Sequence, residues 1–177
     1  TVFTPYKKQW LSKFDEQSPI AILNDNFLSI REPFPDIGTF GFTPSHIRVK
    51  PYQISDLDDY DKLRNIPSLN ATSNLSTHLR FGTVSIREIV SKVRYNESFL
   101  SELIWREFFM QILFHYPTVV SNNFKAKYDN IKWRNNSKEF EQWKQGKTGY
   151  PLVDAGMREL NETGYMHNRV RMVVAGF

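Results

Sequence analysis

The placement of proline limits where regular structure can form in this chain. Six of the nine prolines lie within the first 51 residues, at positions 5, 19, 33, 35, 44 and 51. Proline lacks a backbone N–H and clashes with the preceding turn, so these prolines break any long helical period. We therefore predict an irregular interdomain linker over residues 1–54, with one or two helical turns in Thr4–Phe14. Isolated aromatic side chains are expected to pack the linker down, namely Phe27, Phe34, Phe40 and Phe42.

Helix start and stop signals recur from residue 55 onward. Ser85 and Glu88 form a capping box, Pro117 ends a long run of helix formers, and Gly164 is placed as a C-terminal cap. The predicted helices are an acidic one opened by Ser55, then Ile86–Tyr95, Glu97–Tyr116, 138–144, 151–163 and 167–177. No segment alternates with period two for long enough to predict a strand. The fold class is therefore predicted to be all-α, with one helical unit over residues 55–177.

Composition excludes several classes of function. The 177 residues contain no cysteine, which rules out a disulfide scaffold, thiolate catalysis and Cys-ligated metals. The four histidines lack metal-ligand spacing, so no metal site is predicted. No apolar run approaches the ~18 residues of a membrane span, and we expect a cytoplasmic protein without a membrane partner. The chain starts at Thr1, and we expect it to be a piece of a longer protein.

One stretch has two interpretations that the pattern leaves open. Glu102, Trp105, Arg106 and Phe109 share a face of a helix that is otherwise apolar nearly all round. In the first interpretation the helix is buried and Glu102 pairs with Arg106 four residues later. In the second, the stripe is the wall of a cavity, where aromatic rings stack on a planar ligand. The pattern alone favours the first.

Two further segments are candidate anion contacts. The polar cluster 72–76 precedes an apolar helix, where hydroxyls and backbone N–H groups hold either a phosphate or an ordinary cap. Asn168, Arg171 and Met172 form a stripe on the last predicted helix, with Arg169 offset. The plain alternative there is a solvated basic face, with Asp154 and Arg158 forming a weak surface pair.

The residues also carry a family resemblance. The runs 146–154 (GKTGYPLVD) and 166–172 (MHNRVRM) closely resemble the FAD-binding domain of the DNA photolyase/cryptochrome family. The resemblance covers residues 55–177, and Thr4–Lys8 is similar to the family's entry into its linker. It implies the first half of a helical FAD-binding domain after the linker. It also implies a separate N-terminal domain that holds an antenna pigment, folate or deazaflavin.

The resemblance assigns expected roles by position. It implies FAD contacts at Tyr60, Thr72, Ser73, Leu75, Ser76, Phe99 and Arg171. The resemblance also implies that the protein is a monomer whose partner is damaged DNA. The expected DNA contacts are Arg64, Glu102, Trp105, Arg106, Phe109, Asn168 and Arg169. The expected catalytic residues are Glu102, Trp105, Asn168 and Met172, and Trp133 matches the outermost tryptophan of an electron-transfer chain.

The implied activity is light-driven splitting of cyclobutane pyrimidine dimers, by electron transfer from excited reduced FAD to a flipped-out lesion. Relatives that act on (6-4) photoproducts tend to have Gln where Glu102 stands and a second His in place of Asn168. Two alternatives stay open: a blue-light photoreceptor without repair activity, and an inert fragment that cannot hold FAD alone. The sequence also departs from the family pattern, with Tyr165 at a usual Trp and Gly156 at a usual Ala.

Overall fold

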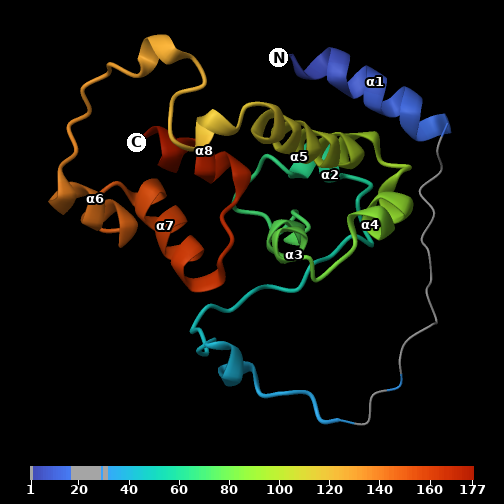
Figure 1. Cartoon of the computed structure of the whole chain (residues 1–177), viewed down its shortest axis with the longest axis horizontal. Helices are drawn as coiled ribbons and strands as arrows, with labels where there is room; N and C mark the ends of the chain where they lie inside the picture. Colours follow the sequence, from blue (N-terminus) through green and yellow to red (C-terminus); the bar gives the residue numbers. More distant parts are fainter. Residues whose placement is uncertain (1, 17–28, 30–31) are drawn as a thin grey trace.

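The computed structural model describes residues 2–15, 29 and 32–177 in full, and residue 16 as the end of the first helix (Figure 1). These residues contain α-helices and short 3-10 helices but no strand, so the all-α prediction is confirmed for the part described. The α-helices are α1 (Phe3–Glu16), α2 (Tyr60–Leu63), α3 (Leu75–Phe81), α4 (Ile86–Val93), α5 (Glu97–His115), α6 (Ser137–Lys144), α7 (Pro151–Thr163) and α8 (Asn168–Gly176). The 3-10 helices are η1 (Ile37–Phe40), η2 (Pro117–Val120) and η3 (Ala126–Tyr128). No described helix is both long enough and apolar enough to span a bilayer.

Local signals predicted most helix ends correctly. Ser85 caps α4 by accepting from the backbone N–H of Glu88, and α5 ends just before Pro117. Gly164 ends α7 in the left-handed region with φ 70°, as its C-terminal cap. Two start predictions were wrong: Asp59, not Ser55, stands before α2, and Asn136 caps α6 one residue earlier than expected.

The N-terminal segment is more ordered than predicted. Instead of one or two turns, α1 runs for 14 residues, and Pro5 is tolerated because it lies in the first turn. The helix packs along α5, where Tyr6 contacts the ring of Phe108 and Trp10 Nε1 donates to Glu107 at 3.5 Å. Tertiary packing of this kind stabilises helices that local signals leave marginal.

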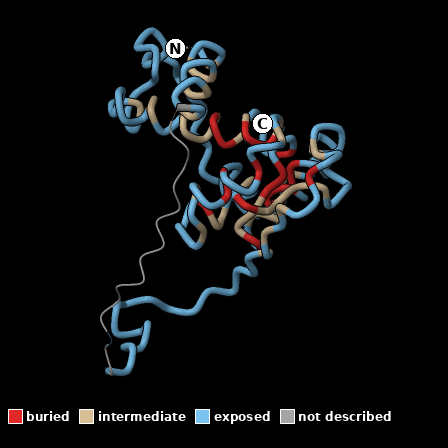
Figure 2. Tube along the Cα trace, turned by 90° about the vertical axis from the view of Figure 1, so that its right-hand side faces the viewer, coloured by how far each residue is buried: buried red, intermediate tan, exposed pale blue. Residues whose placement is uncertain are grey.

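The expected aromatic anchors of the linker were wrong wherever the structure describes them. Phe34, Phe40 and Phe42 are 92%, 60% and 65% exposed, and residues 32–49 are all exposed (Figure 2). Phe27 lies outside the described residues. The aromatic rings that do pack are those of α1.

The buried side chains of the described residues form two separate apolar clusters. The first comes from α3, α4 and α5, with Ile89, Val93 and Ile104 completely buried at its centre. The second lies between α7 and α8, where Val153 and Met157 pack on Val170 and Val174. The part of the chain that the structure describes therefore has two small cores rather than one.

Residues 48–53 tie these two parts together. The backbone N–H of Arg48 donates to Glu162 O of α7 at 2.8 Å. On the other side, His78 Nε2 of α3 bonds to Lys50 O at 2.9 Å, and the N–H of Gln53 donates to Ser73 O at 2.9 Å. The linker boundary at residue 54 stays a prediction, but Arg48 and Lys50 are hydrogen-bonded to α7 and α3, and Gln53 is bonded to the segment before α3.

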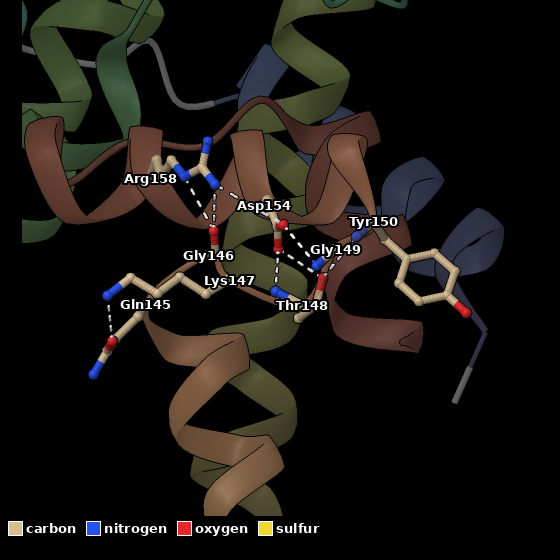
Figure 3. Close-up of polar contacts among 8 residues, drawn as sticks. All are labelled: Gln145, Gly146, Lys147, Thr148, Gly149, Tyr150, Asp154 and Arg158. Atoms are coloured by element: carbon tan, nitrogen blue, oxygen red, sulfur yellow. Dashed lines mark hydrogen bonds and ion pairs between the residues drawn. The ribbon is translucent and has the colours of Figure 1, made fainter.

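The Gly-Lys-Thr-Gly motif forms the turn between α6 and α7, held by a buried carboxylate (Figure 3). Asp154 accepts from Thr148 N and Oγ1 at 2.8 and 2.6 Å and from Gly149 N at 2.9 Å. Arg158 donates instead to Gly146 O, at 2.7 Å from Nη2, and lies 4.0 Å from Asp154. The expected pair of Asp154 with Arg158 thus forms at 4.0 Å, but its carboxylate is buried instead of lying at the surface, and its closer hydrogen bonds go to the turn.

The turn gives a prediction about acid stability. The Thr148 hydroxyl, more than any other group, holds the pKa of Asp154 below its ordinary value. The ionised carboxylate therefore stabilises the fold above the ordinary pKa of about 3.9, and this contribution is lost as the pH falls through the lowered value. We expect Asp154→Asn to be less stable than wild type near neutral pH, with the difference shrinking at about pH 3. Urea unfolding at both pH values measures it.

Asp58→Asn is the matched control, since Asp58 is exposed. It should leave the pH dependence unchanged. A stability gap between wild type and Asp154→Asn that stays constant between the two pH values would contradict this account.

A second prediction concerns the contact between α7 and α8. A Cβ on Gly156 would lie 2.6 Å from Val170 Cγ1 and 2.9 Å from Val174 Cγ2, closer than real methyl contacts. The two buried valines fill the space that an alanine side chain would take. We expect Gly156→Ala to destabilise the protein by about 1–3 kcal/mol, because overpacking outweighs the gain in helix propensity. Denaturant unfolding tests it against Gly176→Ala, where nothing lies within 4 Å of an added Cβ. Equal stability of the two variants would mean that the valines move aside freely.

Candidate functional site

A hollow of about 390 Å³ lies between the two apolar clusters. Its walls come from the end of α2, the segment before α3, the first half of α5, and the turn that leads from α7 into α8. The lining residues are Tyr60, Arg64, Asn65, Thr72, Ser73, Asn74, Leu75, Ser76, Glu102, Tyr165, Met166, His167, Asn168, Arg169 and Arg171. Segments more than 60 residues apart in the sequence thus meet at one place.

An ion pair forms one wall of the hollow. Arg64, just past α2, donates to Glu102 Oε1 of α5, and its guanidinium lies 5.8 Å from the centre of the Tyr60 ring. Burial, followed by the charge of Glu102, raises the pKa of Tyr60 above its ordinary value, so its hydroxyl is neutral throughout the physiological range. The expected Glu102–Arg106 pair was wrong: Arg106 turns away and donates to Leu79 O at 3.5 Å. Glu102 therefore faces the hollow instead of its own helix.

The segment before α3 presents hydroxyl groups to the hollow. Thr72 Oγ1 and Tyr165 Oη are 2.8 Å apart, which joins this segment to the turn before α8. Asn74 adopts a left-handed conformation with φ 53°, and it makes no side-chain capping bond to α3. Ser73 Oγ accepts from Leu75 N at a long 3.4 Å. The ordinary-cap interpretation thus accounts for little of the polarity in this segment.

The start of α8 supplies the positive charge. His167 caps the helix, with Nδ1 accepting from Arg169 N at 3.1 Å, so its neutral form has the proton on Nε2. Arg169 Nε donates across the hollow to Asn65 Oδ1 at 2.8 Å. Arg171 is exposed, and its side chain makes no hydrogen bond or ion pair with another described residue. A guanidinium without a partner at a polar wall is suited to binding an anion.

The wall also holds polar atoms that lack partners. Among the described residues, Arg64 Nε and His167 Nε2 are the buried side-chain nitrogens without a hydrogen bond, and both residues line the hollow. A buried donor without an acceptor costs about 1–3 kcal/mol. Two such donors, several hydroxyls and Arg171 together fit a ligand that is anionic and rich in acceptor atoms.

The structure brings together ten of the residues that the sequence singled out. They are Tyr60, Arg64, Thr72, Ser73, Leu75, Ser76, Glu102, Asn168, Arg169 and Arg171. Trp105, Arg106 and Phe109 lie further along α5 and do not line the hollow. The ring of Phe3 from α1 stacks on Trp105 with the centroids 3.5 Å apart, and Phe109 stacks on it as well at 5.6 Å.

Three other expected residues lie apart from the hollow. Phe99 is buried in the first cluster and meets the hollow only through an edge contact of 5.0 Å with Tyr60. Met172 is 61% exposed, with Sδ 3.2 Å from Arg169 Nη1. Trp133 is 68% exposed and lines a separate apolar hollow of about 480 Å³ beside Trp143 and Phe177.

Five more residues line the hollow. Asn74 lies within the polar cluster 72–76 that the sequence had singled out, whereas Asn65, Tyr165, Met166 and His167 had been given no role in the site. Asn65 carries no local signal, because its role depends on a distant partner, Arg169. Tyr165 and His167 lie directly before the stripe that was noticed, and their polar side chains just past a Gly cap were the available signal.

Comparison with protein families identifies a known domain in the second half of the chain. Residues 99–177 match the family described as the FAD binding domain of DNA photolyase. Two curated relatives are both named deoxyribodipyrimidine photo-lyase. The one from Halobacterium salinarum is 35% identical over 100% of this chain and 43% of its own length. The one from Escherichia coli is 33% identical over 99% of this chain and 43% of its own length. The chain thus spans less than half the length of these relatives.

Solved structures give the same result. A bacterial class III photolyase from Agrobacterium tumefaciens superposes with a TM-score of 0.64 and 41% identity, over 68% of this chain and 27% of that one. A cryptochrome from Synechocystis superposes with a TM-score of 0.69 and 30% identity, over 99% of this chain and 43% of that one.

Proposed function

Because the chain belongs to the DNA photolyase/cryptochrome family, we propose that the protein containing it repairs DNA by light-driven splitting of cyclobutane pyrimidine dimers. The observation that carries this proposal is the shared hollow. Glu102 and Asn168, the expected substrate contacts, line it together with the hydroxyl-rich segment 72–76 and Arg171, the expected cofactor contacts. A cofactor and a substrate that exchange an electron need such a common site.

FAD fits the chemistry of this wall. The hydroxyls of Thr72, Ser73 and Ser76 would donate to its phosphates, and Arg171 would offset their negative charge. The two buried nitrogens without partners, on Arg64 and His167, would face a ligand that offers acceptor atoms. When bound and reduced, FAD supplies the light-excited electron that opens the dimer. Because its hydroxyl stays protonated, Tyr60 would present a neutral donor to the cofactor.

On the substrate side, the residues bind and orient the lesion. A pyrimidine dimer stacks poorly, so extruding it from the helix requires less energy than extruding a normal base. Glu102 would hydrogen-bond the base edge of the extruded dimer and Asn168 would fix its orientation. Arg64 holds Glu102 in place, and Arg169 would contact phosphate, which makes DNA binding weaken with salt.

Trp105 fits a stacking role only if α1 moves. The ring of Phe3 lies parallel to it, 7° from coplanar, and covers one of its faces. An incoming base would replace one aromatic contact with another, so the exchange need not be costly. Trp133, at the surface, would pass electrons to the flavin through tryptophans contributed by the rest of the protein.

The rest of the proposal concerns context. The antenna pigment, folate or deazaflavin, would sit in a separate N-terminal domain, and the protein would act as a cytoplasmic monomer. Residues 1–177 alone would bind FAD weakly or not at all, because they would provide only part of the cofactor site. The similarity to the Synechocystis cryptochrome over 99% of the chain supports a second candidate, a blue-light photoreceptor without repair activity.

The repair proposal predicts light-dependent loss of dimers. Whole, reduced protein should remove cyclobutane dimers from DNA under blue or near-UV light and none in darkness, measured by a dimer-specific antibody. Glu102→Ala should lower the repair rate by roughly tenfold or more, since the hydrogen bond that orients the base edge of the dimer is lost. Glu97→Ala, on the same helix with an exposed carboxylate paired to Lys7, is the control and should repair normally. Unchanged dimer content after illumination would favour the photoreceptor.

A further prediction tests whether Trp105 of α5 stacks on the DNA lesion or only supports the fold. Trp105→Ala should weaken binding of dimer-containing DNA about tenfold, the scale of one lost base-stacking contact, while leaving the flavin content unchanged. Gel-shift titration and flavin absorbance of the same preparation measure the two quantities. If the flavin content falls in proportion to DNA binding, Trp105 supports the fold through Phe3 and Phe108 instead.

A further inference from the structure

The contact between Tyr165 and Thr72 carries an inference beyond the expected site residues. These side chains are 93 residues apart, and their hydroxyl oxygens lie 2.8 Å from each other at the edge of the hollow. Tyr165 stands where the family pattern usually has Trp, which has no hydroxyl. The bond therefore reflects this sequence and not the general pattern of the family.

The tyrosine ring is held firmly in place. Lys50 Nζ lies 5.7 Å from the ring centre and is itself paired with Glu159 of α7 at 2.9 Å. The backbone N–H of Tyr165 donates to Thr163 Oγ1 at 3.1 Å, just after the cap at Gly164. The side chain is half-buried, so its hydroxyl has a defined position relative to Thr72.

We propose that Tyr165 is a positioning residue that donates its hydroxyl proton to Thr72 and thereby directs the Thr72 hydroxyl proton at an anionic oxygen of the bound flavin nucleotide. This rests on the proposed function of the site. A hydroxyl has one proton to donate and two acceptor lone pairs. If Thr72 donates to a phosphate, the Thr72–Tyr165 bond requires the proton of Tyr165. Two hydroxyl bonds in series then polarise each other and strengthen the outer one.

The role of Tyr165 depends on its hydroxyl donating to Thr72 Oγ1. Without it, the Thr72 side chain loses its only described side-chain partner and its hydroxyl is free to rotate. Flavin binding would then have to fix the orientation of that hydroxyl. The entropy lost in doing so would weaken the contact between Thr72 and the flavin. Tyr165 need not touch the flavin for this effect, because it acts through Thr72.

A double-mutant cycle on flavin affinity tests the proposal. In the whole protein stripped of flavin, FAD is titrated by fluorescence quenching into wild type, Tyr165→Phe, Thr72→Val and the double variant. We expect Tyr165→Phe to weaken FAD binding about 3- to 10-fold and Thr72→Val about 10-fold. In the Thr72→Val background, Tyr165→Phe should change the affinity less than about 2-fold, because its effect passes through the missing hydroxyl.

Tyr95→Phe is the control, since Tyr95 is 63% exposed and does not line the hollow, and it should bind FAD like wild type. Both site substitutions keep the shape of the side chain, and thermal unfolding checks that each variant is folded. Equal weakening by Tyr165→Phe in both backgrounds would overturn the proposal, as would unchanged affinity in Tyr165→Phe or in Thr72→Val.

The proposed function is judged separately. If the wild-type protein binds FAD and repairs dimers but the cycle shows no coupling, Tyr165 has no positioning role and the proposed function still holds. If the wild-type protein binds no FAD, both the role of Tyr165 and the proposed function are wrong.

Discussion

Polar contacts across a hollow join the two apolar clusters of this molecule, and the site depends on them. One cluster is built on α3, α4 and α5, the other on α7 and α8. Between them run the Thr72–Tyr165 bond, the Arg169–Asn65 bond and the strap at residues 48–53. Had the clusters merged into one core, apolar side chains would fill the space that hydroxyls and guanidiniums now line. The division into two cores is what leaves room for a polar ligand.

The same arrangement explains why this wall holds polar groups that its own residues do not satisfy. Arg64 and His167 each bury a nitrogen without a partner, and Arg171 lacks a counter-charge among the described residues. Such groups destabilise a fold unless a ligand supplies the missing hydrogen-bond acceptors and counter-charge. A bound nucleotide supplies the acceptors and the negative charge, so ligand binding and stability are expected to be linked.

Local chemistry explains how much of the fold could be predicted. Capping residues and prolines act within a few residues, which is why α4, α5 and α7 were placed closely by Ser85, Pro117 and Gly164. The length of α1 could not be read this way, because its stability comes from rings that rest on α5 far along the chain. The exposed Phe34 shows the reverse error, since an aromatic residue does not by itself guarantee a partner.

For the candidate site too, the sequence predicted which residues take part better than it predicted the contacts between them. Family resemblance singled out most of the residues that line the hollow, but it did not reveal their contacts. Glu102 was expected to pair within its helix and instead meets Arg64, 38 residues earlier, because the end of α2 lies against α5. Trp105 was expected at the site and is covered by Phe3. Tyr165 was noticed as a departure, yet its bond to Thr72 requires knowledge of the tertiary fold.

The central claim is that one flavin contacts both walls of the hollow at once. Hydrogen–deuterium exchange of the whole protein with and without FAD tests this most directly. The account predicts that FAD slows exchange in the peptides covering both 72–76 and 165–171, while the exposed stretch 32–46 exchanges equally fast in both states. Protection confined to one of the two walls, or absent from both, would contradict it.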